Sequence, residues 1–416
     1  MTALRFALAV GLILLWTGAV FAAAVNGFWR PAITQDRTAE GFVTAVARDM
    51  PEDFRGNLML ITLENGIPAA RLAVGPEGAV PDGSSVFQIA SLSKWVTATG
   101  VLTLVRDGMI GLDDPVQDHV TRWSLPGDPE DVGGVTIRRL LSHTAGLTDG
   151  LGYQGFESKS DVQSLESSLT QAADAMEGAS GSVAIGQEPG RAWAYSGGGY
   201  TLLQLMIEEV TGESFAEAMT TRVLAPSGMT HSSFAYDDIK DRLALSYDAT
   251  GAITPHRHYT ALAAASLYTT ADDLALFLSA VSRPSSQGGL LPMDLMQDMR
   301  AVHARQYGLP VWGLGTVIYV SEGHENQVIG HEGANFPATN TSARQHVQSG
   351  DGIVILATSS TNIASRIADD WTYWRTRELA ITALPQALRT AFLVWAAGIV
   401  AVALLGLRKS QRAKGR

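Results

Sequence analysis

Residues 86–98 of this chain, Val-Phe-Gln-Ile-Ala-Ser-Leu-Ser-Lys-Trp-Val-Thr-Ala, form a short strand-like run that leads into a helix. The segment contains Lys94, one of only five lysines in 416 residues, in surroundings that are apolar on most sides. An ammonium group removed from water must find acceptors, or its pKa falls. Ser91 lies three positions earlier, on the same face of a helix. Because a hydroxyl beside a desolvated amine is an activated nucleophile, we predict that Ser91 and Lys94 form a catalytic pair.

The bulk composition limits the classes of function. A chain of 416 residues with 46% hydrophobic and 17% charged residues predicts a globular protein with a large core and some membrane segments. The net charge of −11 disfavours nucleic acid as a partner. The absence of cysteine excludes disulfides, thiolate catalysis and cysteine-type zinc sites. His256 and His258 have no carboxylates at ligand spacing, so we expect no metal and no organic cofactor.

Both ends of the chain have the composition of bilayer segments. Residues 1–24 predict either a signal peptide, with a small-residue cleavage site at Ala22-Ala23-Ala24, or an uncleaved N-terminal anchor; 25–37 predict a linker. Residues 390–407 are apolar and long enough to span a membrane. The basic tail 408–416 follows at once. Because positive flanks stay in the cytoplasm, we expect a cell-membrane protein whose catalytic domain lies on the periplasmic side.

The segment between these ends predicts one α/β domain over residues 38–380. A strand pair is expected at 55–74 with a hairpin turn at Glu64-Asn65-Gly66, and further strands at 315–320, 327–330 and 352–357. Helical patterning is expected at 38–50, 91–106, 200–211, 215–224, 272–281 and 361–380. The expected fold is therefore an antiparallel sheet flanked by helices, with an all-α insertion at about 108–310 and terminal transmembrane segments.

A series of motifs runs through this domain, in residues 87–94 (Phe-Gln-Ile-Ala-Ser-Leu-Ser-Lys), 108–115, 140–147 (Leu-Leu-Ser-His-Thr-Ala-Gly-Leu), 189–190 with 193–196 (Trp-Ala-Tyr-Ser), 226–229 and 331–333 (His-Glu-Gly). Together they resemble the serine β-lactamase and penicillin-binding-protein superfamily, in the branch of class C β-lactamases, D-aminopeptidases and related esterases. Their order and spacing agree from about residue 36 to 375. The resemblance implies the β-lactamase-like sandwich and serine hydrolysis.

The resemblance assigns Tyr195 to proton transfer between the nucleophile and the leaving group. A phenol near an ammonium is drawn toward phenolate, so it can accept a proton and return it. Family members usually have asparagine two positions after this tyrosine, where it binds the acyl-amide of the substrate. This chain has Gly197 there, which puts recognition of β-lactams and peptides in doubt. His143 lies in a turn that we interpret as architectural.

The third motif supplies the expected substrate-binding strand. By resemblance, His331 replaces the more common lysine that holds a substrate carboxylate, and Gly333 lets substrate approach the strand. As a cation His331 would bind anionic substrates, and their affinity should fall as pH rises through the histidine pKa. The backbone N–H of Ala334 and that of Ser91 would form the oxyanion hole by analogy.

These residues predict a membrane-anchored serine hydrolase acting on a small-molecule acyl substrate, a small ester or a D-amino-acid or peptide-type amide. A β-lactamase or cell-wall D,D-peptidase is the enzymatic alternative. A penicillin-recognising sensor that does not hydrolyse its ligand, or another binding or adhesive domain, is the non-enzymatic alternative.

Overall fold

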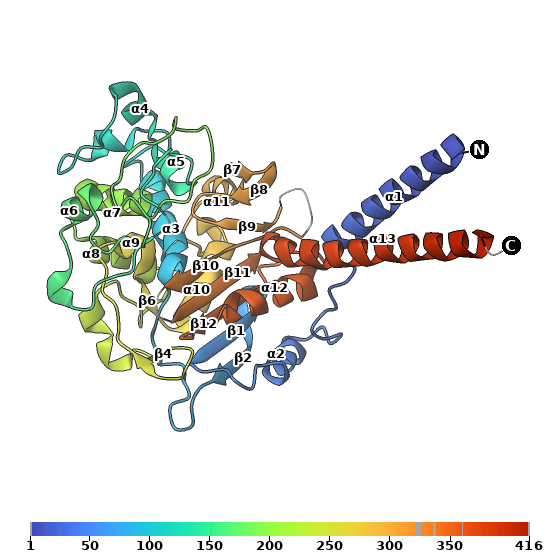
Figure 1. Ribbon diagram of the computed structural model, residues 1–416. Coiled ribbons are helices and arrows are strands. Elements are labelled where there is room, and N and C mark those ends of the chain that lie inside the picture. The colour runs from blue at the N-terminus through green and yellow to red at the C-terminus, as the bar shows by residue number, and fades with distance from the viewer. Residues whose placement is uncertain (1, 151, 322–325, 336–337, 360, 415–416) are drawn as a thin grey trace. The chain divides into compact units, whose positions relative to one another are not determined.

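The computed structural model describes residues 2–150, 152–321, 326–335, 338–359 and 361–414 (Figure 1). The chain divides into two compact units, Asp36–Ala368 and the terminal segments Met1–Gln35 with Asp369–Arg416. Each unit is described by itself below.

The larger unit is built on an eight-stranded sheet with the order β2-β1-β12-β11-β10-β9-β8-β7, in which all neighbours are antiparallel (Figure 1). Two-stranded sheets pair β3 with β6 and β4 with β5. The strands are β1 Leu58–Glu64, β2 Ile67–Val74, β3 Phe87–Gln88, β4 Ser246–Tyr247, β5 Ile253–Thr254, β6 Tyr268–Thr269, β7 Ala304–Gln306, β8 Leu309–Trp312, β9 Val317–Val320, β10 Val328–Asn335, β11 Thr339–His346 and β12 Gly352–Ala357.

Helices of the larger unit occupy both faces of this sheet and a cluster beside it (Figure 1). The α-helices of both units, of which α1 and α13 belong to the terminal one, are α1 Thr2–Val25, α2 Ala39–Arg48, α3 Ser93–Arg106, α4 Pro129–Gly134, α5 Ile137–Leu141, α6 Leu165–Thr170, α7 Gly197–Thr211, α8 Phe215–Met219, α9 Leu262–Ala265, α10 Ala271–Ser282, α11 Met293–Arg300, α12 Ile363–Thr376 and α13 Leu384–Lys414. Helix α3 lies between the sheet and helices α7 and α9 (Figure 1). This fold confirms the expected α/β class with an antiparallel sheet.

Side chains of β11 contact helices on both faces of the sheet. Successive residues of a strand point to opposite sides. The amide of Gln345 donates to the Leu278 carbonyl of α10 at 2.9 Å. On the other face, the side-chain oxygen of Asn340 accepts from the Ala364 N–H of α12 at 2.6 Å. The sheet is therefore covered by helices on both sides at its centre, where β1, β11 and β12 are almost wholly buried.

The first hairpin forms as expected, and several later strands were not expected. Asn65 and Gly66 both have positive φ, 52° and 74°, which suits the tight turn between β1 and β2. Strand β11 was missed because its sequence, Thr-Asn-Thr-Ser-Ala-Arg-Gln-His, has no apolar pattern. Its polar side chains are buried with partners instead: Arg344, fully buried, pairs with Glu332 on β10 at 2.6 Å. The region 108–310 also contains the short strands β4 to β7 among its helices.

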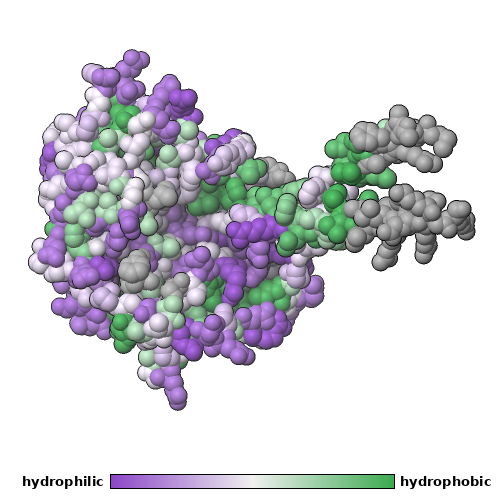
Figure 2. All heavy atoms as spheres, viewed as in Figure 1, coloured by the Kyte–Doolittle hydropathy of each residue, from purple (hydrophilic) through white to green (hydrophobic). Residues whose placement is uncertain are grey.

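The terminal unit contains two apolar helices that pack against each other. One helix of the described chain, over Ile381–Val402, is long and apolar enough to cross a membrane by length and composition, and Val10–Val25 is a shorter apolar helix. Figure 2 shows hydrophobic residues over the coloured parts of these helices. Val20 and Ala24 of α1 pack on Ala391, and the Trp395 indole donates to the Thr17 hydroxyl at 2.9 Å. These contacts make the pair antiparallel; residues 1, 415 and 416 of the predicted terminal segments lie outside the described residues.

Candidate active site

Ser91 and Lys94 lie together as their spacing predicts. Residues Ala90–Leu92 form one turn of 3₁₀ helix that runs directly into α3, and Lys94 is in the first turn of α3. The Lys94 side chain is 2% exposed. Its Nζ lies 3.2 Å from the Ser91 Oγ and donates to the Ala264 carbonyl at 2.7 Å. These two acceptors offset the lost solvation of the buried amine, and they leave it in contact with the half-buried serine.

The backbone before Ser91 is held in an unusual conformation. Ala90 has φ of 48°, in the left-handed region that an alanine rarely adopts. Two contacts fix this bend: the Ser93 hydroxyl donates to the Ala90 carbonyl at 2.6 Å, and the Thr341 hydroxyl of β11 donates to the Ile89 carbonyl at 2.9 Å. The bend places Ser91 directly before α3, in a turn that contacts β10 and β11.

Aromatic rings enclose the lysine. The Lys94 Nζ lies 5.0 Å from the ring centroid of Tyr195 and 5.5 Å from that of Tyr200, within range of cation–π attraction. Burial raises the pKa of Tyr200 well above its usual value, and its hydroxyl donates to the Leu141 carbonyl at 3.1 Å. Tyr200 is therefore a neutral, hydrogen-bonded ring that packs beside Lys94. Tyr195 is half-buried and remains the available phenol beside Lys94.

His143 brackets Tyr195. Its carbonyl accepts from the Ala194 N–H at 2.8 Å, and its Nδ1 accepts from the Ser196 N–H at 3.2 Å. The His143 and Tyr195 rings lie 4.4 Å apart. Burial, then the charge of Lys94, lowers the pKa of His143 well below its usual value, so the imidazole is neutral. These contacts are architectural, and they hold the tyrosine on both sides.

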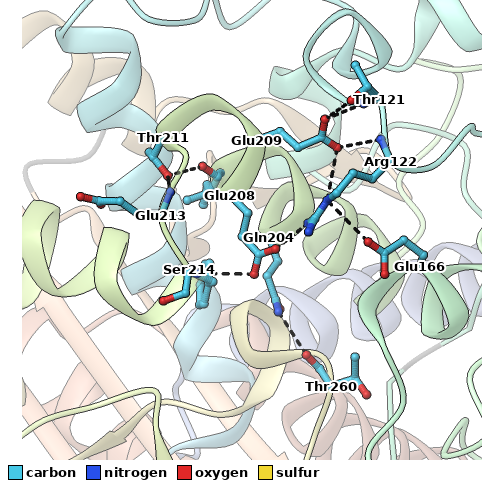
Figure 3. Close-up of polar contacts among 12 residues, drawn as sticks. Thr121, Arg122, Glu166, Gln204, Glu208, Glu209, Thr211, Glu213, Ser214 and Thr260 are labelled. Carbon is cyan, nitrogen blue, oxygen red and sulfur yellow. Dashed lines mark hydrogen bonds and ion pairs between the residues drawn. The ribbon is translucent and has the colours of Figure 1, made fainter.

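The segment that supplies the Ala264 carbonyl is tied to α7. The Gln204 amide donates to the Thr260 carbonyl at 3.2 Å, and its oxygen accepts from the Ala263 N–H at 3.0 Å (Figure 3). On the same helix, Glu208 and Glu209 accept from Arg122 (Figure 3). Helix α7 thus joins the loop that orients Lys94 to the helical cluster.

His331 is on β10, where it faces the site, but it is not a cation. The side chain is 2% exposed, and its Nδ1–H donates to the Glu332 carbonyl at 2.6 Å. Burial, then the charge of Lys94, lowers its pKa to about 3. In the protein without a bound anion, burial and a neighbouring ammonium both favour the neutral ring, which disfavours the expected role of His331 as a cation for a substrate carboxylate. Its ring packs edge-on against Trp312 at 5.3 Å.

Gly333 brings β10 against the nucleophile turn. A Cβ at this position would lie 2.1 Å from the Ile89 carbonyl oxygen and 2.5 Å from the Thr341 hydroxyl. Only glycine fits such an approach. Ala334 follows at an exposed position of the strand. Ala334 and Ser91 therefore belong to adjacent segments. An oxyanion hole built from their two N–H groups requires this arrangement.

Tyr153 fills the space beside Gly197. A Cβ at Gly197 would lie 3.0 Å from the Tyr153 ring, and the Tyr153 hydroxyl bonds with that of Thr201 at 3.1 Å. The Tyr153 ring thus packs beside the position where the family resemblance implies an asparagine side chain. Sequence reasoning missed Tyr153, Tyr200, Trp312 and the Ala264 carbonyl, because none of them belongs to a local motif with the nucleophile.

Comparison with known proteins agrees with this fold. Penicillin-binding protein 4* of Bacillus subtilis (strain 168) is 40% identical over 147 residues, which are 35% of this chain and 30% of that protein. The chain spans less than a third of the length of the curated relatives it matches first.

Solved structures are similar over most of the chain. The octameric penicillin-binding protein homologue from Pyrococcus abyssi has a TM-score of 0.66 at 22% identity, covering 80% of this chain and 75% of the other. The D-amino acid amidase from Ochrobactrum anthropi SV3 has a TM-score of 0.60 at 20% identity, covering 89% and 99%. The Beta-lactamase family model matches residues 57–378, the stretch that contains every residue of the candidate active site. The chain therefore belongs to the Beta-lactamase family, whose fold is that of serine hydrolases.

Proposed function

We propose that this protein is a serine hydrolase that cleaves an ester or amide bond through an acyl-enzyme on Ser91. The observation that carries the proposal is the 3.2 Å contact between the Lys94 Nζ and the Ser91 Oγ inside a wall of aromatic rings. An amine this close to the hydroxyl can steer the transfer of its proton during attack on a carbonyl.

The proposed reaction has two halves, acylation of Ser91 and hydrolysis of the acyl-enzyme, and the same residues act in both. The Ser91 oxygen bonds to the carbonyl carbon as the Ser91 proton passes to the Tyr195 phenolate, which the adjacent Lys94 ammonium stabilises. The N–H groups of Ser91 and Ala334 stabilise the oxyanion. The bond to the leaving group then breaks, and Tyr195 returns the proton to it. Water adds to the acyl-enzyme by the same route in reverse, releasing the acid and restoring the Ser91 hydroxyl.

We propose a small ester or a D-amino-acid amide as substrate. Gly197 and the Tyr153 ring support this choice, because a side-chain amide that would bind a substrate amide is missing at that point. The similar fold of a D-amino acid amidase is consistent with it. The same missing amide also favours the second candidate, a sensor that is acylated but does not turn over.

A substrate panel tests the proposal. Purified protein is given p-nitrophenyl esters, nitrocefin and D-alanyl amides, and its intact mass is followed. Turnover of esters or D-alanyl amides with loss of activity in Ser91→Ala supports the hydrolase. Preferred turnover of nitrocefin indicates a β-lactamase, and a stable adduct without turnover indicates a sensor. No adduct on Ser91 with any probe would refute the acyl-enzyme.

We further propose that α1 is retained and that α1 and α13 anchor the protein with its hydrolase domain outside the cytoplasm. The packing of Trp395 on Thr17 supports retention, because cleavage after α1 would remove the partner of α13. The antiparallel pair would bring Arg5 and the basic tail to one side of the membrane, as positive flanks require.

The natural absence of cysteine makes this topology testable. Single cysteines are introduced as Thr2→Cys, Ser410→Cys and, as the exterior control, Ser158→Cys. In intact cells a membrane-impermeant maleimide should label only the variant at 158, and lysis should expose the other two. Labelling at 410 before lysis, or loss of residue 2 from the mature protein, would contradict the two-helix anchor.

A further inference from the structure

A cavity lies beside the segment that leads into the nucleophile turn. It has a volume of about 200 Å³, and its lining includes Gln88, Tyr236, Lys240, His256, Arg257 and Thr339. Gln88 is on β3, three residues before Ser91, and Thr339 begins β11, where it pairs with Asn335 at the end of β10. The cavity therefore continues the site past Ala334, toward the C-terminal end of the strand that carries His331.

The walls of the cavity are tied to the segment that holds Lys94. The His256 Nε2 and the Tyr268 hydroxyl are 2.9 Å apart, and the Gln88 amide donates to the Tyr268 and Ser266 hydroxyls at 3.4 Å. Ser266 follows Ala264, the acceptor of Lys94, by two residues. The cavity wall and the catalytic segment thus form one hydrogen-bonded structure.

Two cations supply the charge of this cavity. Lys240 is exposed at its wall and forms no ion pair within the part of the chain that the structure describes. Arg257 uses one terminal nitrogen on the exposed Glu157 at 2.9 Å, while its buried Nε has no hydrogen-bond partner among the described residues. Two acids of this segment are engaged elsewhere, since Asp237 pairs with Lys159 and Asp238 accepts from Ser233; the exposed Asp241 follows Lys240 in the sequence.

The ring faces add a flat apolar surface. Tyr236 and His256 stack with ring centroids 4.7 Å apart and planes 9° from parallel. Burial lowers the pKa of His256 to about 4, so this ring is neutral and packs as an apolar face. A cavity with cations at its wall and a stacked platform suits a short apolar chain that ends in an anionic group.

The position of the proton donor decides whether the acyl group or the leaving group of a substrate lies toward this cavity. The leaving group must lie near its proton donor, which is Tyr195 in the proposed mechanism. Tyr195 lies among His143 and Trp312, and Trp312 also contacts His331, upstream of Gly333 on β10. The acyl group must extend the other way, past Ala334 toward Gln88 and Thr339.

We propose that this cavity is an acyl-side subsite for a substrate carboxylate, held by Lys240 and Arg257. The proposal rests on the proposed hydrolase function. In this proposal the cavity binds the substrate anion, whereas His331 is a buried, neutral side chain of β10.

The test compares two esters with acyl chains of equal carbon number, mono-p-nitrophenyl glutarate and p-nitrophenyl pentanoate. The ratio of their kcat/KM values is measured in the full-length protein and in Lys240→Met, Lys240→Arg and Arg257→Met. We expect the methionine variants to lower the glutarate-to-pentanoate ratio about tenfold, mainly through KM, as loss of a partly screened charged hydrogen bond should. Lys240→Arg should restore most of the ratio.

Arg305→Met is the control, because Arg305 is an exposed cation on β7 outside the cavity lining. It should leave the ratio unchanged. A ratio equally unchanged in Lys240→Met and Arg257→Met would overturn the subsite while leaving the hydrolase intact. Failure of the unaltered protein to hydrolyse either ester would instead count against the proposed function on esters, so the two failures are distinguishable.

Discussion

The chemistry depends on how single residues are charged. Lys94 is buried, yet it has the Ala264 carbonyl, the Ser91 hydroxyl and two ring faces around it. The imidazoles of His143 and His331 near it are held neutral by burial and by the lysine itself. The sequence predicts which residues meet here, but it cannot predict these charge states, because burial is a property of the folded chain.

A buried carboxyl beside the helical cluster gives a prediction on stability. Asp174 is 6% exposed, neither of its oxygens has a hydrogen-bond partner among the described residues, and burial raises its pKa to about 6. Its folded pKa is above its unfolded value, so its contribution to stability is full below pH ~4 and is lost as pH rises through ~6.

Replacing this carboxyl should therefore stabilise the protein at neutral pH. We expect Asp174→Asn to raise the free energy of unfolding at pH 7.5 by about 1–3 kcal/mol and to flatten the loss between pH ~4 and ~6.5. Urea unfolding of both proteins across this pH range measures the effect. The exposed Asp161→Asn is the control, and equal pH slopes in all three proteins would contradict the buried, raised pKa.

Contacts between elements fix the relative positions of the reacting groups. Strand β10 and the turn before α3 meet where Gly333 has no side chain. Gly333→Ala should push the strand away, and we expect a fall in kcat/KM of about 10²-fold or more, because the N–H of Ala334 would leave its position. Overpacking should cost about 1–3 kcal/mol of stability.

Ester hydrolysis and thermal unfolding measure both effects. Gly133→Ala on α4 is the control, since a Cβ there has no atom within 4 Å. Full activity in Gly333→Ala would show that β10 does not provide a close-fitting wall for the nucleophile.

Several of these elements could be predicted from sequence. The β1–β2 hairpin has alternating strand residues around Asn65-Gly66, and α10 begins with two acids after the Thr270 N-cap. Strand β11 could not be predicted, because its buried polar residues are stabilised by partners on other elements. Arg344 pairs with Glu332 of β10, and Asn340 accepts from the Ala364 N–H of α12. The Ser91 and Lys94 contact followed from spacing alone, whereas Tyr153 beside Gly197 required the fold.

At the scale of the whole molecule, the family match and the apolar ends occupy different stretches of the chain. The match ends at residue 378, before α13 begins. A fragment of residues 36–378, exported with a cleavable leader, should therefore hydrolyse esters with kcat/KM within about twofold of the full chain and should leave the membrane fraction. Ultracentrifugation and the ester assay check this. A fragment that stays in the membrane pellet while folded and active would contradict anchoring by the termini.

The most direct test of the central claim is the rate at which Ser91 is acylated. With an activated ester or a fluorophosphonate, followed by intact mass and peptide mapping, the unaltered protein should gain one adduct on Ser91. Lys94→Met should slow this step by about 10²–10⁴-fold while keeping the fold, and Lys159→Met should not. Acylation of Lys94→Met at the unaltered rate, or an adduct on another serine, would contradict the account.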